Sequence, residues 1–414
     1  MGKSVQPLLA GVVTALVGFA SSFAVVLAGL RAVGADDRQA ASGLFALCIG
    51  IGVTAILLSV RRRMPITIAW STPGAALLVS TGPVAGGFAA AEGAFLVAGM
   101  LIVAAALFPV LSRWITAIPG PIASAMLAGV LLELCLAPAH AVVQVPWLAV
   151  PVVLVWAVLY RFARAWAVPG ALVAAIAAIA LAGTDRPLSG GLWPEPVLTA
   201  PTFTASALIS IALPLFLVTM AAQNIPGIAV LAGFGYHPPI RPLLAATGVA
   251  SIAASLFGGH ALNLAAISAA LAAGPEGGPD PKRRWIASAT AGVGMIGLGL
   301  AGGLAMALVT VSPPILIEAV AGLALLGAFA SALVAAVTPV EGRDAAIVTL
   351  VVTASGMNLF GVGAAFWGLV AGGLMYLLQR RRPVRRSADT AQPVIETPSA
   401  QAGAEPVVGA GLRR

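Results

Sequence analysis

Pro65–Pro83 (PITIAWSTPGAALLVSTGP) and Phe257–Pro275 (FGGHALNLAAISAALAAGP) are two short hydrophobic segments, interrupted by Gly and Pro, at matching places in the two halves of the chain. At an offset of 192 residues, Gly82 coincides with Gly274 near the end of each segment. A bilayer core of about 30 Å requires about 20 helical residues, so we do not interpret either segment as an ordinary span. Interrupted segments in corresponding halves indicate the binding site of a transporter. We therefore expect short broken helices here.

The composition is typical of a helical membrane protein with many spans. Of the 414 residues, 60% are hydrophobic and 9% are charged, and the mean hydropathy is +1.03. A soluble protein of this length needs more charge to cover its surface. We predict an all-α polytopic membrane protein with 14 transmembrane segments, in which segments 3 and 10 are the short broken helices. The predicted segments are residues 7–30, 40–60, 65–81, 88–110, 114–136, 146–162, 166–183, 203–232, 241–257, 260–273, 284–309, 313–337, 344–358 and 360–379.

The basic residues are distributed unevenly between the two sides of these segments. With the N-terminus in the cytoplasm, 19 of the 22 Lys and Arg fall on the inner side, and only Arg31, Arg38 and Arg186 fall on the outer side. This asymmetry follows the positive-inside rule and predicts that both termini are cytoplasmic. The net charge of +8 is therefore explained by topology, and we expect no nucleic-acid partner.

Similar segments recur in the two halves of the chain and divide it into two sets of seven spans. VVLAGL (Val25–Leu30) recurs as AVLAGF (Ala229–Phe234), and PIASAMLAGVLL (Pro121–Leu132) recurs as PILIEAVAGLAL (Pro314–Leu325). An odd number of spans inserts the second copy upside down, which predicts a 7+7 inverted repeat. The expected divisions are residues 1–183 for the first repeat, 184–202 for an outer connecting loop, 203–379 for the second repeat and 380–414 for a disordered, basic cytoplasmic tail.

The broken segments suggest how a substrate is bound. Where a helix starts in mid-membrane, its unpaired N–H groups carry partial positive charge, and they attract an anion without a buried Lys or Arg. An anionic substrate is therefore expected, although a neutral one fits the pattern too, and so does a purely structural role for the breaks. The substrate-binding candidates are Phe23, Ser71, Thr72, Gln223, Asn224, His260 and Asn263.

The amides and the histidine have a functional and a structural interpretation. Gln223 and Asn224 stand directly before Pro226 in the eighth span, where they either line a cavity or join helices, because buried amides need partners. His260 and Asn263 are three residues apart, so we expect them on one face of the tenth span. His260 either carries a proton near neutral pH or is a hydrogen-bonded structural residue.

The remaining substrate-binding candidates are two hydroxyls and a ring. Ser71 aligns with Asn263 in the repeat, and Thr72 follows it; their hydroxyls face a substrate or bond back within their own helix. Phe23 follows two serines in the first span, where its ring stacks on an aromatic ligand or simply packs.

Three carboxylates fall in or near spans, and intramembrane carboxylates are candidates for proton transfer. Glu133 and Glu318 lie in the fifth and twelfth spans, whereas Glu92 lies near an outer end where water would solvate it. With His260 they are the proton-coupling candidates. Cys48 and Cys135 lie within spans without metal-ligand spacing, and no catalytic constellation is present in the sequence. We expect no metal, no cofactor other than the coupling proton, and no enzyme activity.

Four stretches resemble the bacterial benzoate:proton symporters of the BenE family. They are GFASSFAVVLAGLRAVGA (Gly18–Ala35), MPITIAWSTPGAALL (Met64–Leu78), MAAQNIPGIAVLAGFGY (Met220–Tyr236) and FGGHALNLAAISAAL (Phe257–Leu271). The resemblance covers all the predicted spans and implies proton-coupled uptake of benzoate across the bacterial inner membrane. The implied partners are a small aromatic carboxylate, a proton and the lipid bilayer, and a homodimer is a further partner left open.

The architecture is similar to that of the uracil-permease and nucleobase–ascorbate transporters, which implies a core of spans 1–4 and 8–11 and a gate of spans 5–7 and 12–14. Gln223 and Asn224 replace the Glu-His pair that uracil permeases carry in the eighth span, and His260 falls where their tenth span carries a glutamate. The loss of both acids suits an anion. A nucleobase or other organic-anion transporter of this fold remains an alternative, and so does a passive anion channel.

Overall fold

The protein is described by a computed structural model that covers residues 5–108, 119–182, 193–303 and 312–380. The first half contains α1 (Val5–Ala20), α2 (Phe23–Ala32), α3 (Asp37–Arg62), β1 (Ile68–Trp70), α4 (Thr72–Thr81), α5 (Gly87–Leu107), α7 (Gly120–Gln144), α8 (Pro146–Phe162), the 3-10 helix η1 (Arg164–Trp166) and α9 (Ala167–Ala182).

The second half contains α10 (Ala205–Ala207), the π-helix η2 (Leu208–Ala212), α11 (Leu213–Thr219), the π-helix η3 (Met220–Asn224), α12 (Ile225–Gly233), α13 (Ile240–Ser255), β2 (Leu262–Leu264), α14 (Ile267–Ala273), the 3-10 helices η4 (Pro275–Gly277) and η5 (Pro281–Arg283), α15 (Trp285–Leu300), α17 (Pro314–Val337), α18 (Arg343–Ala354), β3 (Asn358–Leu359), β4 (Val362–Gly363) and α19 (Ala364–Arg380).

Seven helical runs among the described residues are long and apolar enough to cross a membrane. These runs are Val5–Ala32, Asp37–Arg62, Gly87–Leu107, Gly120–Gln144, Arg164–Ala182, Ala205–Gly233 and Pro314–Val337. Three shorter apolar helices are Pro146–Phe162, Ile240–Ser255 and Ala364–Gln379. The expectation of a helical membrane protein with many spans is confirmed, and α8 has the bounds that the sequence predicts for the sixth span.

The two broken segments differ from helices in a way that the sequence does not reveal. Each begins with a three-residue strand and continues as a short helix, and the two strands pair antiparallel with Ala69 opposite Asn263. Asn263 therefore lies in β2, and His260 lies in the non-helical segment just before it, so the expectation that they share a helical face is wrong. Pairing β1 with β2 satisfies backbone groups that would otherwise be unpaired inside the membrane.

The first predicted span is also interrupted. The sequence predicts a continuous span over residues 7–30, but α1 ends at Ala20 and α2 begins at Phe23. The hydroxyls of Ser21 and Ser22 donate to the Gly18 carbonyl oxygen over 3.0 and 3.3 Å, which offers the backbone an alternative to helical bonding at this point.

Small residues bring the helices of the bundle close together. A Cβ atom placed on Gly52 of α3 would lie 2.5 Å from the carbonyl oxygen of Gly292 in α15. Likewise, a Cβ on Gly248 of α13 would lie 3.1 Å from the Gly99 carbonyl oxygen in α5. Close backbone approach through glycine is the usual way in which helices associate in lipid, where apolar burial alone gives little driving force.

Helices α7 and α17, which contain one of the pairs of similar sequences, begin with the same backbone conformation. Pro119 before α7 and Pro313 before α17 both have φ −57° and ψ 129°. These two helices pack against each other, and a Cβ on Gly322 of α17 would lie 2.0 Å from the Leu134 carbonyl oxygen of α7.

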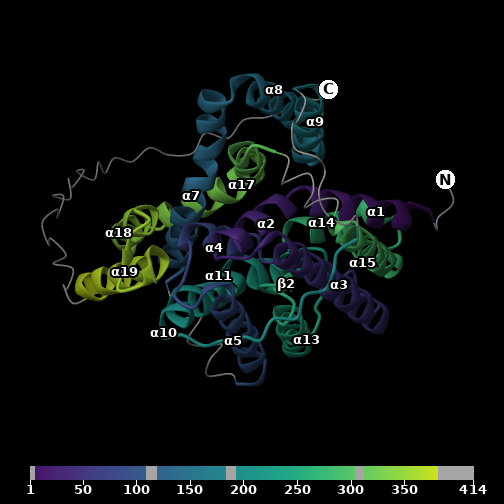
Figure 1. Ribbon diagram of the computed structural model, residues 1–414. Coiled ribbons are helices and arrows are strands. Elements are labelled where there is room, and N and C mark those ends of the chain that lie inside the picture. The colour runs from purple at the N-terminus through teal and green to yellow at the C-terminus, as the bar shows by residue number, and fades with distance from the viewer. Residues whose placement is uncertain (1–4, 109–118, 183–192, 304–311, 381–414) are drawn as a thin grey trace, which may run out of the picture.

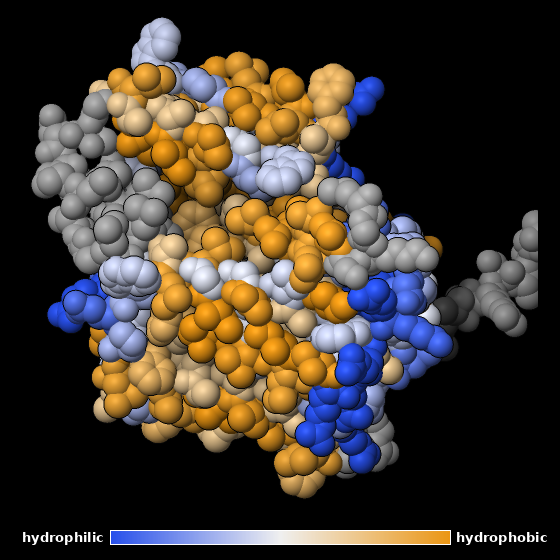
Figure 2. Space-filling model, turned by 90° about the vertical axis from the view of Figure 1, so that its right-hand side faces the viewer, coloured by the Kyte–Doolittle hydropathy of each residue, from blue (hydrophilic) through white to orange (hydrophobic). Residues whose placement is uncertain are grey.

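The helices gather in two groups in Figure 1. Helices α1–α5 and α11–α15 surround the strand β2, whereas α7–α9 and α17–α19 lie above and to the left of them. In Figure 2 a broad apolar surface is bordered by hydrophilic residues on two opposite sides, as expected for a protein embedded in a bilayer.

Candidate functional site

The strand pair β1–β2 places the two broken segments in contact. Beyond the ladder itself, the Ser71 N–H donates to the Ala261 carbonyl oxygen, and the Ala265 N–H donates to the Thr67 carbonyl oxygen, each over 2.9 Å. Because the strands are antiparallel, α4 and α14 leave opposite ends of the pair. Each helix therefore directs its N-terminus towards the strands.

The N-terminus of α4 keeps one free backbone donor. Ser71 is the N-cap: its Oγ accepts from the Gly74 N–H over 3.1 Å and from the Thr219 hydroxyl over 2.9 Å, and the residue is fully buried. Pro73 has no N–H to satisfy. Among the described residues, neither the N–H nor the hydroxyl of Thr72 has a hydrogen-bond partner, and Thr72 is half-buried.

Asn224, at the end of η3, binds this helical run to β2. Its Oδ1 accepts from the Leu264 N–H over 2.9 Å, its Nδ2 donates to the Met220 sulfur over 3.3 Å, and the residue is fully buried. Gly227 lies one turn further along, where a Cβ would be 2.8 Å from the Leu264 Cβ. The π-helix η3 precedes Pro226, and π-helical turns of this kind are frequent at functional sites.

Gln223 differs from its neighbour. It is half-buried, and its amide has no hydrogen-bond partner among the residues that the structure describes. It follows Thr219 by one turn, and Thr219 bonds to Ser71. Gln223 in η3 and Thr72 at the start of α4 therefore both keep polar groups without a partner in the described part of the chain, and the Thr219–Ser71 hydrogen bond links these two stretches of chain.

Asn263 is engaged within the strand pair. In the orientation that satisfies its amide, Nδ2 donates to the carbonyl oxygens of Ala69 and Trp70 over 2.6 and 3.1 Å. The side chain is fully buried. This arrangement stabilises the bend between β1 and α4.

Phe23 belongs to an aromatic cluster beside the strands. Its ring stacks on Phe19 with centroids 5.1 Å apart, and Phe19 meets Trp70 edge-on at 5.9 Å. The Trp70 indole N–H donates to the Ser22 hydroxyl over 2.9 Å, so the break in the first span is tied to β1. Phe23 is 3% exposed and packs within the cluster.

His260 lies at the start of the β2 segment and is fully buried. Its Nδ1 accepts from the Ala261 N–H over 2.7 Å, so the neutral ring carries its proton on Nε2. Nε2 has no partner among the described residues. The ring meets Phe95 of α5 edge-on, with centroids 6.4 Å apart.

Glu92 is buried, not solvated as its sequence position suggests. It lies on α5 between Phe88 and Phe95 on one helix face, and it is 1% exposed. The Phe88 ring lies 3.2 Å from a Cβ placed on Gly258, so this face of α5 covers the turn that leads to His260. The Thr199 side chain lies close by, but no described residue has hydrogen-bonding geometry with either carboxyl oxygen.

The other two carboxylates lie away from the strand pair. Glu133 of α7 is exposed, and Glu318 of α17 is half-buried. They are close enough for Glu133 to repel Glu318 electrostatically. Both belong to the second group of helices in Figure 1, which contains neither β1 nor β2.

The structure thus brings together six of the seven substrate-binding candidates around the strand pair, with Phe23 in the adjoining aromatic cluster. Sequence reasoning missed Trp70 and Thr219, which touch the site through Ser22 and Ser71. Trp70 stands inside a broken segment and Thr219 stands four residues before Gln223, so position alone could have indicated both.

Interrupted helices that meet inside a bundle of apolar helices define a membrane transport protein. The sequence matches the family model described as BenE, benzoate membrane transport protein, over residues 2–378. It is 39% identical over 375 residues to the inner membrane protein YdcO of Escherichia coli (strain K12), covering 90% of this chain and 95% of that protein.

It is also 31% identical over 376 residues to the benzoate membrane transport protein of Acinetobacter baylyi (strain ATCC 33305 / BD413 / ADP1), covering 91% of this chain and 95% of that protein. The chain belongs to the BenE family. The family and its Acinetobacter member are described as membrane transport proteins, so the chain is not an enzyme.

Solved structures share the fold at low sequence identity. The transmembrane domain of the cyanobacterial bicarbonate transporter BicA aligns with a TM-score of 0.60 at 16% identity, covering 90% of this chain and 98% of that one. SLC26A9 aligns with a TM-score of 0.63 at 12% identity, covering 90% of this chain and 64% of that one. The likeness extends over nearly the whole bundle.

Proposed function

We propose that the protein is a secondary active transporter that takes up benzoate or a closely related aromatic carboxylate together with a proton. The observation that carries this proposal is the pair of unused donors at the strand pair, on Thr72 and Gln223. Both residues are half-buried, so neither is sealed in the protein interior. Family membership supports the substrate class, since one relative is named a benzoate membrane transport protein.

The carboxylate would lie at the N-terminus of α4, in the gap towards the start of α14. There it would accept from the Thr72 N–H and hydroxyl and from the Gln223 amide, and the dipole of α4 would favour its charge. Fully buried Ser71, Asn224 and Asn263 would hold these donors in place through the bonds described above. The Phe19–Phe23–Trp70 cluster would flank the ring of the substrate.

The same proposal includes the arrangement of the whole chain. Fourteen segments would form a 7+7 inverted repeat with both termini in the cytoplasm. The core (spans 1–4 and 8–11) would carry the strand pair, and the gate (spans 5–7 and 12–14) would rock against it. The two groups of helices in Figure 1 and the matching starts of α7 and α17 support this division.

Glu92 is our first candidate for the proton carrier. A carboxylate that is buried without a partner is costly, so this group would be protonated in the described conformation and would ionise when the site opens. Phe95, on the same face of α5 as Glu92, meets the ring of His260, whose Nε2 has no partner among the described residues. Around the connection between α2 and α3, Arg31 is paired with Asp37 and Arg38 with Glu195. Glu133 and Glu318 remain the alternatives.

Uptake into proteoliposomes tests this proposal. An inward proton gradient should drive labelled benzoate above its external concentration, and clamping the membrane potential should change nothing, because one anion and one proton move together. Thr72→Val should raise the KM for benzoate about 10-fold, since a hydrogen bond to a charged group contributes about 1.5–3 kcal/mol. The matched control is Thr81→Val at the other end of α4, where the hydroxyl donates to the Leu77 carbonyl oxygen.

Three results would count against the proposal. Benzoate that only equilibrates would indicate a passive channel. Uracil that competes better than benzoate would indicate a nucleobase transporter. Equal effects of the two valine substitutions would remove the α4 N-terminus from the site.

A further inference from the structure

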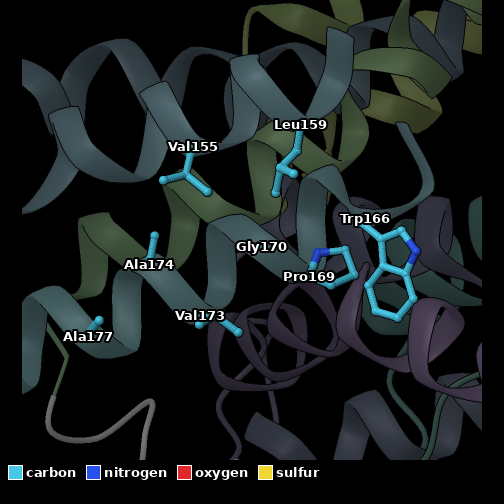
Figure 3. Close-up of a pocket in the computed structure, with 8 residues that line it drawn as sticks. All are labelled: Val155, Leu159, Trp166, Pro169, Gly170, Val173, Ala174 and Ala177. Carbon is cyan, nitrogen blue, oxygen red and sulfur yellow. The ribbon is translucent and has the colours of Figure 1, made fainter. Parts of the chain in front are cut away.

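An apolar cavity of about 440 Å³ lies between α8 and α9, away from the strand pair. Figure 3 shows the side chains of α8 pointing down onto α9 across this cavity. Leu159 packs over Gly170, where a Cβ would be 2.1 Å from its Cδ1, so glycine makes room at the floor. The lining residues are Val155, Leu159, Trp166, Pro169, Gly170, Val173, Ala174 and Ala177.

The cavity opens on the outer surface of the helix bundle. Val173, which lines it, is 65% exposed, and Leu154 and Val158 on the neighbouring face of α8 are 59% and 56% exposed. Side chains of this kind face lipid in a membrane protein. Lipid hydrocarbon therefore has access to the cavity, and its apolar lining suits a chain of methylene groups.

One end of the cavity is basic. Leu159 and Trp166 mark that end, and the exposed residues Arg161 and Arg164 lie between them in the chain. Arg161 lies over the Phe162 ring at 5.4 Å, and Arg164 lies over the Tyr160 ring at 4.8 Å. No carboxylate among the described residues pairs with either guanidinium. Two positive charges thus remain available where α8 ends and aromatic residues gather, as they do at a membrane interface.

We propose that this cavity is a binding site for one anionic glycerophospholipid. An acyl chain lies between α8 and α9, and the phosphate binds Arg161 and Arg164. Basic pockets between helices recognise anionic headgroups in this way, and arginine donors match phosphate geometry. The proposal does not depend on the transported substrate, because the cavity shares no residue with the strand pair.

Native mass spectrometry of the purified full chain tests the site. The probes are phosphatidylglycerol and phosphatidylcholine with identical acyl chains, added in equal amounts. The wild-type protein should retain phosphatidylglycerol in preference. Each basic residue near an anionic surface contributes about five-fold in binding, so Arg161→Gln/Arg164→Gln should lower that preference by roughly 25-fold.

Two further variants separate this site from general effects. Arg61→Gln/Arg62→Gln removes two exposed arginines from the last turn of α3, which does not line this cavity, and should leave the preference unchanged. Ala177→Trp should fill the cavity and lower retention of both lipids, while its exposed position spares the core. Thermal unfolding of each variant checks that it is folded.

Several results would overturn the proposal. One is equal retention of the two lipids by the wild-type protein. Another is the same loss of preference for phosphatidylglycerol in Arg161→Gln/Arg164→Gln and in Arg61→Gln/Arg62→Gln. A third is a dimer that Ala177→Trp abolishes, which would assign the cavity to a second copy of the chain.

Discussion

The neighbouring amides Gln223 and Asn224 should give opposite results when each is replaced with alanine. Asn224 is fully buried, and its Oδ1 accepts from the Leu264 N–H over 2.9 Å. Gln223 is half-buried and has no partner among the described residues. We expect Asn224→Ala to reduce stability and Gln223→Ala to reduce substrate binding.

The magnitudes follow from these surroundings. Asn224→Ala leaves a buried backbone N–H without an acceptor, which costs about 1–3 kcal/mol, and it loses the contact with the Met220 sulfur. The midpoint of thermal unfolding should therefore fall by several degrees. Gln223→Ala breaks no bond in the described structure, so stability should change by no more than about 0.5 kcal/mol. Loss of one hydrogen bond to a carboxylate should raise the KM about 10-fold or more.

Thermal unfolding in detergent and initial uptake rates in proteoliposomes measure the two effects. Wild-type protein should be stabilised by added benzoate, and Gln223→Ala should lose most of that stabilisation while its ligand-free midpoint stays the same. The reasoning would be refuted if Asn224→Ala unfolded at the wild-type temperature, or if Gln223→Ala lost stability and kept its KM.

Three further predictions test single contacts. Ser71→Ala removes the N-cap of α4 and should cost about 1 kcal/mol, seen as a lower melting temperature; an unchanged midpoint would contradict the capping role. Gly227→Ala forces a Cβ to within 2.8 Å of β2 and should destabilise by about 1–3 kcal/mol, whereas Gly233→Ala on the same helix meets open space and should not; equal melting temperatures would contradict this packing. Glu92→Gln should abolish accumulation driven by a proton gradient but preserve benzoate exchange, measured by counterflow; retained accumulation would exclude Glu92 as the carrier.

Much of the fold is predictable because the membrane imposes a simple pattern. Apolar runs give most of the helices, and Gly and Pro give the breaks in Pro65–Pro83 and Phe257–Pro275. The sequence does not predict the strands, since three residues are too few to show an alternating pattern. Their register also depends on a partner in the other half of the chain. The break at Ser21–Ser22 contains neither Gly nor Pro, which is why the sequence predicts a continuous first span.

The site could be predicted only as a set of residues. The position before Pro226 indicates Gln223 and Asn224 together, but it does not show which of the two amides forms a hydrogen bond with β2. That difference depends on Leu264, which approaches only because Gly227 lacks a side chain. The burial of Glu92 likewise depends on the segment around Thr202, whose N–H donates to the Ala89 carbonyl oxygen over 3.0 Å.

The central claim is that the start of α4 binds the carboxylate of an aromatic acid. Anomalous diffraction from crystals grown with 4-bromobenzoate would locate the ligand directly. We predict bromine density beside the Phe19–Phe23–Trp70 cluster, with the carboxylate at the Thr72 N–H and the Gln223 amide. Bromine density only at a different place, in a crystal whose protein still transports the compound, would contradict the claim.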